Sequence, residues 1–190
     1  MESCLNQFKP HLDLQLTLSG SQWEEMKPLF EQVSLKKERQ LTGKTGDLFY
    51  IVSGLLIENQ NLGPKGSTMV RFFQENEFFT YPKKLMENEI VATKETILLK
   101  ISVKKMSAVQ NISAAFYDLW KIVKKEATGK YNKRMEFLQG FKHQRFDNFQ
   151  KQFPVAAASI RNIDLCTYLD INKTYFSTIR SPKKVRAKKN

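Results

Sequence analysis

The stretch "DLCTYLDINKTYFSTIR" (residues 164–180) contains two short amphipathic segments joined by three residues. In the first segment, Leu165 and Leu169 fall on one helical face. In the second segment, Phe176 and Ile179 share a face at a spacing of three. Asn172 directly precedes the second segment, where its amide oxygen is suited to accept the free N–H groups of a first helical turn. The pattern predicts two short helices around a tight turn.

The opposite face of the second predicted helix carries no acid. Its hydroxyls and bases are suited to contact phosphates and base edges. These candidate DNA-binding residues are Lys173, Thr174, Tyr175, Ser177, Thr178 and Arg180, followed by Lys183 and Lys184 in the basic tail. We therefore expect a helix-turn-helix whose second helix enters the major groove of double-stranded DNA. An ordinary helical hairpin that closes a small core is the alternative.

The distribution of charge agrees with a polyanionic partner. Residues 1–120 contain 14 Lys and Arg and 14 Asp and Glu, whereas residues 121–190 contain 17 bases and 5 acids. The last third therefore carries the whole net charge of +12. Such segregation is typical of nucleic-acid binding. A basic surface without a partner is the alternative.

Residues 41–101 alternate short β-rich runs with turn residues. The runs include "LFYIVSGLLIEN" and "TMVRFFQE", and six of the eight glycines of the chain lie within its first 66 residues. No helical crossover is visible between the runs, so we expect an antiparallel barrel or sandwich. A helix is expected just before it, with Ser21 as cap and Glu24 three residues further on.

A long helix follows, from about residue 103 to 138. Apolar residues recur there at intervals of three or four, which is the spacing of an apolar stripe. They include the predicted dimer residues Ile112, Phe116, Leu119, Val123 and Ala127, and the stripe continues through Tyr131, Met135 and Leu138. Either a neighbouring domain or the same helix of a second subunit must cover this stripe, and we favour a homodimer. A further helix is expected from about 141 to 153.

The sequence offers no catalytic, metal or cofactor site. Cys4 and Cys166 are far apart, and His11 and His143 lie outside the predicted β-region. Iron–sulfur, haem and multi-histidine metal chemistry are therefore not expected, and neither is an enzyme. No apolar run approaches the roughly 20 residues that cross a bilayer, and no secretion signal is visible, so we expect no membrane association and a cytoplasmic location.

The order of these parts resembles the cyclic-AMP receptor protein (Crp/Fnr) family of transcription regulators, in a Bacteroidetes-like branch. The resemblance rests on "LFYIVSGLLIEN" (48–59), "TKETILLKIS" (93–102), "RFDNFQKQFP" (145–154) and the closing helical pair. It implies an α+β fold, with an antiparallel β-roll of the cyclic-nucleotide-binding, jelly-roll kind, a long dimerisation helix and a small C-terminal helix-turn-helix domain. The expected boundaries are 1–110 for the roll with its N-terminal helix, 111–139 for the long helix and 140–190 for the DNA-binding domain.

The resemblance implies a DNA-binding transcription regulator, with two departures at the helical pair. Thr178 stands where the family has an arginine, so the sequence preference should differ. Asp170 replaces a turn glycine, and aspartate tolerates the left-handed conformation better than most residues. The alternative is a small-molecule or protein-binding β-roll whose degenerate helix-turn-helix binds nucleic acid only nonspecifically.

The resemblance also locates an effector pocket, but the residues there do not suit cyclic AMP. Glu77 stands for the glutamate that meets the ribose, although Asn76 replaces its glycine. Glu87, Asn88 and Glu89 fall where a phosphate-binding arginine is expected, and acids would repel a phosphate. We therefore expect an unidentified small-molecule effector, or none, in place of cyclic AMP.

Overall fold

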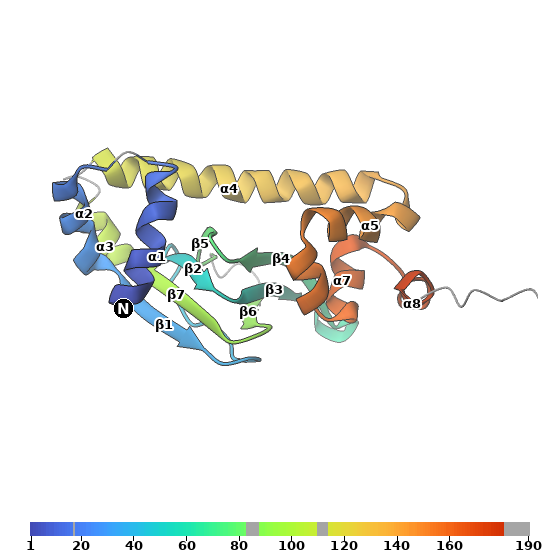
Figure 1. Cartoon of the computed structure of the whole chain (residues 1–190). Helices are drawn as coiled ribbons and strands as arrows, with labels where there is room; N and C mark the ends of the chain where they lie inside the picture. The colour runs from blue at the N-terminus through green and yellow to red at the C-terminus, as the bar shows by residue number, and fades with distance from the viewer. Residues whose placement is uncertain (17, 83–87, 110–113, 181–190) are drawn as a thin grey trace, which may run out of the picture.

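The computed structural model describes residues 1–16, 18–82, 88–109 and 114–180 (Figure 1). Two β-sheets form the middle of the molecule, with N-terminal helices at one end and C-terminal helices at the other. The long helix α4 (Ala114–Gln139) runs along one side and connects the two ends (Figure 1). In the described part of the chain, no helix combines the length and apolar character needed to span a membrane.

All described strand pairs are antiparallel, as the sequence predicts. Sheet A has the order β1-β7-β2-β5 and sheet B the order β4-β3-β6. The strands are β1 (Glu31–Leu35), β2 (Leu48–Ser53), β3 (Leu55–Asn61), β4 (Ser67–Gln74), β5 (Phe78–Thr80), β6 (Asn88–Ala92) and β7 (Thr96–Ile101). A short 3-10 turn, η2 (Gly63–Lys65), joins β3 to β4.

The chain passes from sheet A to sheet B at Gly54. Its φ of 115° is a conformation that residues with a side chain rarely adopt. A Cβ at this position would also lie 2.3 Å from Oγ1 of Thr96, the first residue of β7. Thr96 is buried, and its Oγ1 accepts the backbone N–H of Leu55 at 3.3 Å. Glycine is therefore required for β3 to leave the plane of β2.

Three apolar layers lie on successive faces of the sheets. The inner layer, between the sheets, contains three rings in a row: Phe73 and Phe79 are 4.2 Å apart, and Phe79 and Phe49 are 5.3 Å apart. The outer face of sheet A packs against the N-terminal helices around Phe8, which is fully buried. The outer face of sheet B packs against the C-terminal helices.

Four helical segments surround the outer face of sheet A: α1 (Glu2–Asp13), α2 (Gly20–Met26), η1 (Lys27–Leu29) and α3 (Val103–Val109). The capping prediction was wrong by two residues. Ser19 caps α2, because its hydroxyl accepts the N–H of Gln22 while the Gln22 side chain accepts the N–H of Ser19. Helix α1 was not predicted from the sequence.

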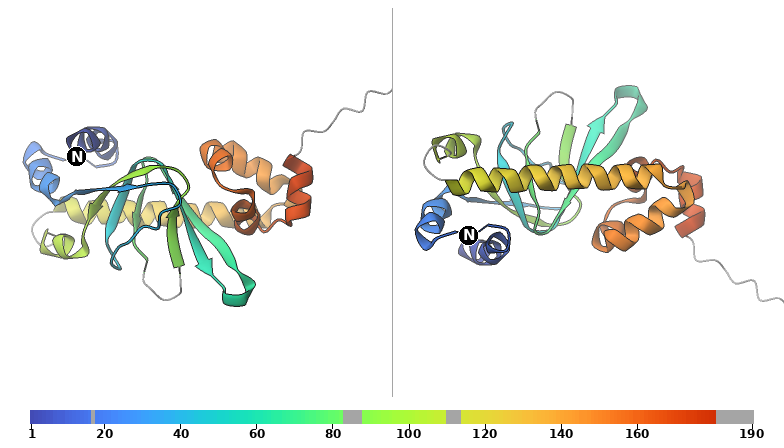
Figure 2. Two further views of the ribbon diagram at one scale, coloured as in Figure 1. Left: turned by 90° about the horizontal axis from the view of Figure 1, so that it is seen from below. Right: turned by 90° about the horizontal axis from the view of Figure 1, so that it is seen from above.

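The C-terminal region consists of α5 (Lys142–Gln152), α6 (Pro154–Ser159), α7 (Asn162–Leu169) and α8 (Lys173–Arg180) (Figures 1 and 2). Helices α7 and α8 lie in the two stretches where the sequence predicts them. The core of this region is continuous with sheet B, because the ring of Phe72 on β4 makes edge contacts with Phe149, Phe153 and Tyr168. The C-terminal helices therefore share one core with the sheets.

The inward face of α4 differs from the predicted stripe. Met135 follows Leu119 by four steps of four residues. At 3.6 residues per turn, these steps amount to four full turns and a further rotation of about 160° around the helix axis, so the two residues lie on nearly opposite sides. Leu119 is accordingly buried, whereas 37% of Met135 is exposed. Phe137 lies five full turns beyond Leu119 and is buried at the other end of the helix.

We expect Gly54→Ala to lower the free energy of unfolding by about 2 kcal/mol or more, because a positive φ and a steric clash coincide. Urea unfolding followed by circular dichroism would measure this loss. Gly20→Ala is the matched control, since nothing lies within 4 Å of a Cβ at Gly20 and alanine favours the helix. Equal unfolding midpoints for the two variants would contradict the role of Gly54.

Candidate DNA-binding surface

The turn between α7 and α8 is fixed by backbone geometry and one side-chain cap. Asp170 adopts the left-handed conformation at φ 50°, and the backbone N–H groups of Asp170 and Ile171 both point to the carbonyl of Cys166. Asn172 Oδ1 accepts the backbone N–H of Thr174 at 2.8 Å, as the capping prediction requires. These contacts set the angle at which α8 leaves α7.

Arg145 holds this turn against the end of α4. Its side chain is 8% exposed and donates to the carbonyls of Leu138 and Gly140 at 2.6 and 3.2 Å. The same guanidinium donates to the carbonyls of Leu169 and Asp170 at 3.0 and 3.1 Å and to the Asp170 carboxylate at 3.2 Å. The aspartate that replaces the turn glycine thus has a buried cationic partner. Sequence reasoning missed Arg145, because a single arginine in a basic region gives no signal.

Two further contacts fix the helical pair in place. Phe176, 1% exposed, packs edge-on against Phe146 of α5 with ring centroids 4.8 Å apart. The backbone N–H of Met69 on β4 donates to Thr167 Oγ1 at 2.9 Å, which joins α7 to sheet B. The side of α8 opposite Phe176 therefore faces away from the protein.

The candidate DNA-binding residues lie on this outward side where the structure describes their side chains. Exposed residues of α8 are Lys173, Thr174, Tyr175, Ser177 and Thr178. The exposed hydroxyls of Ser177 and Thr178 donate to the carbonyls of Lys173 and Thr174. Arg180 ends α8, but its side chain, like Lys183 and Lys184, lies outside the described part. The described outward face contains no acid.

The predicted dimer residues separate into two groups. Leu119 and Val123 are buried against the N-terminal helices and sheet A of the same chain, so intramolecular packing covers them. Ala127 is exposed. Ile112 and the side chain of Phe116 lie outside the described part.

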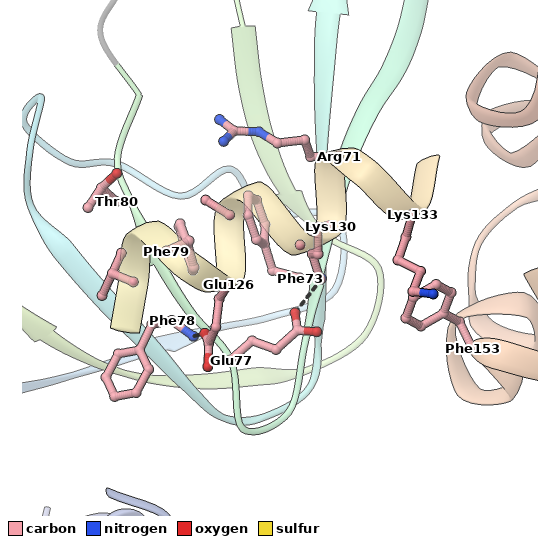
Figure 3. Close-up of a pocket in the computed structure, with 13 residues that line it drawn as sticks. Arg71, Phe73, Glu77, Phe78, Phe79, Thr80, Glu126, Lys130, Lys133 and Phe153 are labelled. Carbon is pink, nitrogen blue, oxygen red and sulfur yellow. Dashed lines mark hydrogen bonds and ion pairs between the residues drawn. The ribbon is translucent and has the colours of Figure 1, made fainter. Parts of the chain in front are cut away.

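A pocket of about 370 Å³ lies beneath the middle of α4 (Figure 3). Its lining comes from β4, the β4–β5 turn, β5 and α4, and it includes four phenylalanines and five charged residues, with Phe153 of the C-terminal region at one edge. Arg71 also lines it, but its guanidinium points away from the centre and pairs with the buried Glu58 at 2.6 Å. This is the position from which an effector would contact both the sheets and α4.

Lys130 crosses this pocket from α4. Its ammonium pairs with Glu77, donates to the carbonyl of Phe72 at 2.6 Å and lies 4.2 Å from the centroid of the Phe72 ring. Glu126, one turn earlier, accepts the backbone N–H of Phe78 at 2.9 Å. Burial raises the pKa of both carboxyls, and Lys130 opposes the rise, while burial lowers the pKa of Lys130. The three groups tie α4 to the β4–β5 turn.

Within the described residues, no three His, Cys, Asp or Glu side chains gather as metal ligands. Cys4 and Cys166 are both free thiols.

We expect Arg145→Met to lower the free energy of unfolding by about 2–4 kcal/mol, because it leaves buried carbonyls without donors. Urea unfolding of the full chain would measure the change. Lys142→Met is the control: Lys142 is exposed, 3.8 Å from the same Asp170 carboxylate, and should contribute less than about 1 kcal/mol. A loss no larger than that of the control would show that Arg145 does not hold the turn.

We expect Lys130→Met to destabilise the fold by about 2–4 kcal/mol at pH 8, because it leaves two partly buried carboxylates without a cation. Their pKa values should then rise further in the folded state, so stability is retained at low pH and lost as pH increases through those values. The loss relative to the unmutated chain should be smaller at pH 4.5. Urea unfolding at both pH values would test this.

The control for Lys130 is Lys133→Met, since Lys133 lies three residues away, exposed and paired with Glu136. An equal loss at both pH values in the Lys130 variant would rule out the electrostatic explanation.

No protein-family model and no curated protein sequence matches the chain. Solved structures do match. FixK2 from Bradyrhizobium japonicum superposes with a TM-score of 0.65 at 15% identity, over 79% of this chain and 82% of that one. A transcriptional regulator of the crp/fnr family from Eubacterium rectale gives a TM-score of 0.64 at 13% identity, over 85% and 82%.

A cyclic nucleotide-binding domain containing protein from Listeria monocytogenes gives a TM-score of 0.66 at 11% identity, covering 91% of this chain and 88% of that one. At such identities, structural similarity establishes the fold alone. The chain therefore shares the fold of these structures over most of its length.

Proposed function

We propose that the protein is a transcription regulator that binds double-stranded DNA through α8 and acts by binding, without catalysis. The observation that carries the proposal is the outward face of α8, which is acid-free where described and is held rigidly by Arg145 and Phe176. Helices α7 and α8 then form a helix-turn-helix with α8 as the recognition helix. The shared fold supports this role, and the Bacteroidetes-like branch rests on the closing sequence alone.

Most of the affinity should be electrostatic. The last 70 residues carry 17 bases, and each neutralised phosphate releases counterions, so binding should weaken steeply with salt. The hydroxyl oxygens of Ser177 and Thr178 are suited to accept from adenine or cytosine amino groups in the major groove. Lys173, at the start of α8, is suited to phosphate contact.

We propose a homodimer that pairs through the outward side of α4. Tyr117 and Tyr131 are each 64% exposed there and stand two heptads apart, and Met135 lies one turn beyond Tyr131 on the same side. This stripe supports the pairing, since large exposed aromatics on a long helix are typical of an interface. Ala127, although exposed, lines the pocket beneath α4. A two-fold pair would address half-sites about 34 Å apart.

The pocket beneath α4 is the candidate effector site, and its ligand should not be cyclic AMP. The carboxylate of Glu77, which the resemblance assigns to the ribose, is engaged by Lys130 and by the backbone N–H of Gln74 at 2.8 Å. A ribose would have to displace a buried ion pair. The four phenylalanines of the lining, beside charged groups that already have partners, support an effector with a large apolar part instead.

Selection of duplexes from a randomised DNA library by the full chain tests the proposal. We expect enrichment of a palindrome with half-sites about 10 base pairs apart. Thr178→Val should change the preferred bases. Lys173→Ala, and the pair Lys183→Ala with Lys184→Ala, should weaken binding to all sequences alike and lower the salt slope by about 1 per lysine.

Lys104→Ala is the matched control for Lys173→Ala. Both lysines are exposed near the start of a helix, but α3 lies at the opposite end of the molecule from α8 (Figure 1). Binding without enrichment of any sequence would favour the alternative, a nonspecific nucleic-acid binder. Loss of affinity in the Lys104 variant equal to that in the Lys173 variant would exclude α8 as the contact surface.

A further inference from the structure

A second cavity, a groove of about 430 Å³, lies between the outer face of sheet B and the junction of α6 and α7. Its sheet wall is formed by Ile57 and Asn59 of β3 and by Glu89 and Val91 of β6, and its other wall by Ser159 and Arg161. None of its residues lines the pocket beneath α4.

Asn59 is the unusual residue of this groove. It is 5% exposed and follows Ile57 by two positions on the same strand, so both side chains point to the outer face of sheet B. Its buried Oδ1 has no hydrogen-bond partner, a property that only Asn88 Oδ1 shares among the described side chains. Buried acceptors without a donor are disfavoured, so a donor in the groove would satisfy Asn59 Oδ1 once the side chain turns toward it.

The neighbours of Asn59 indicate which donor fits. Glu89 is the partner of Asn59 in the β3–β6 register, so its carboxylate and the Asn59 oxygen stand side by side on one face. Two adjacent acceptors, one of them anionic, match an ammonium group, which has three donors. Ile57 and Val91 supply apolar surface on the same wall.

The opposite wall offers the complementary charge. Arg161 donates from Nε and Nη2 to Asp164 at 2.7 and 3.2 Å, which leaves further N–H groups of the guanidinium for a carboxylate. Lys37 and Glu38, which follow β1 and pair with each other at 3.9 Å, also line the groove. The acceptors of Asn59 and Glu89 and the guanidinium of Arg161 together suit a zwitterion.

We propose that this groove binds a small apolar zwitterion, an α-amino acid or a dipeptide. Its ammonium contacts Asn59 and Glu89, its carboxylate contacts Arg161, and its side chain lies on Ile57 and Val91. Arg161 directly precedes α7, whereas Asn59 belongs to sheet B. The ligand therefore fastens the start of α7 to the sheet. The site does not depend on the proposed DNA binding.

Thermal unfolding of the full chain with L-leucine and with L-leucyl-L-leucine tests the site and distinguishes the two sources of the zwitterion. We expect at least one of them to raise Tm by about 5 °C or more at a hundredfold excess over its Kd. N-acetyl-L-leucine, which lacks the ammonium, and L-leucinamide, which lacks the carboxylate, should raise Tm much less.

Asn59→Leu should abolish the shift, whereas the matched control Asn88→Leu should retain it. Asn88 also has an oxygen without a partner but donates to Glu58 at 2.8 Å and does not line the groove. Calorimetric titration of the unmutated chain with the same four probes replaces the variants if Asn59→Leu does not fold. The proposal is overturned if neither zwitterion binds, if all four probes act alike, or if Asn59→Leu keeps the shift.

Discussion

Both sheets are apolar on both faces, so helices of the same chain have to cover their outer faces. Burial of this surface is the main favourable contribution to folding, and no arrangement of the two sheets alone would achieve it. The N-terminal helices cover sheet A around Phe8, and the C-terminal helices cover sheet B around Phe72. The position of α8, and with it the proposed DNA-binding surface, follows from this coverage.

Helix α4 contacts both ends of the molecule and is fixed in the middle by charge. Leu119 packs at the N-terminal end and Phe137 at the C-terminal end, while Lys130 and Glu126 bind the β4–β5 turn between them. An ion pair shielded from water adds little net stability, but removal of one partner is strongly destabilising because the other charge is left unpaired. The pair therefore fixes the position of α4 more than it stabilises the fold. The proposed effector in the pocket beneath α4 would contact these same groups, and its binding would thereby be coupled to the position of the C-terminal helices.

The turn of the helical pair shows how an aspartate in the left-handed conformation is compensated. Aspartate in the left-handed conformation costs more than glycine, yet the Asp170 carboxylate accepts from Arg145, which also reaches the end of α4. The same arginine thus links the turn that orients α8 to the helix proposed for dimerisation. In a dimer, the spacing of the two α8 helices would depend on this link.

The sequence by itself determined the local elements, because periodicity and capping act over a few residues. These elements are the antiparallel strands, the positions of α7 and α8, the Asn172 cap, and the exposure of the polar side chains of α8 around the buried Phe176. Only the tertiary structure decided which side of α4 faces inward. Its inner face contains the charged residues Glu126 and Lys130, so a pattern of apolar residues does not identify it. The apolar residues spaced three or four apart instead wind from the inner to the outer side of the helix. The partners of Arg145 and the groove at Asn59 could not be predicted for the same reason: they join residues far apart in the chain, and only the packing of the C-terminal helices on sheet B brings them together.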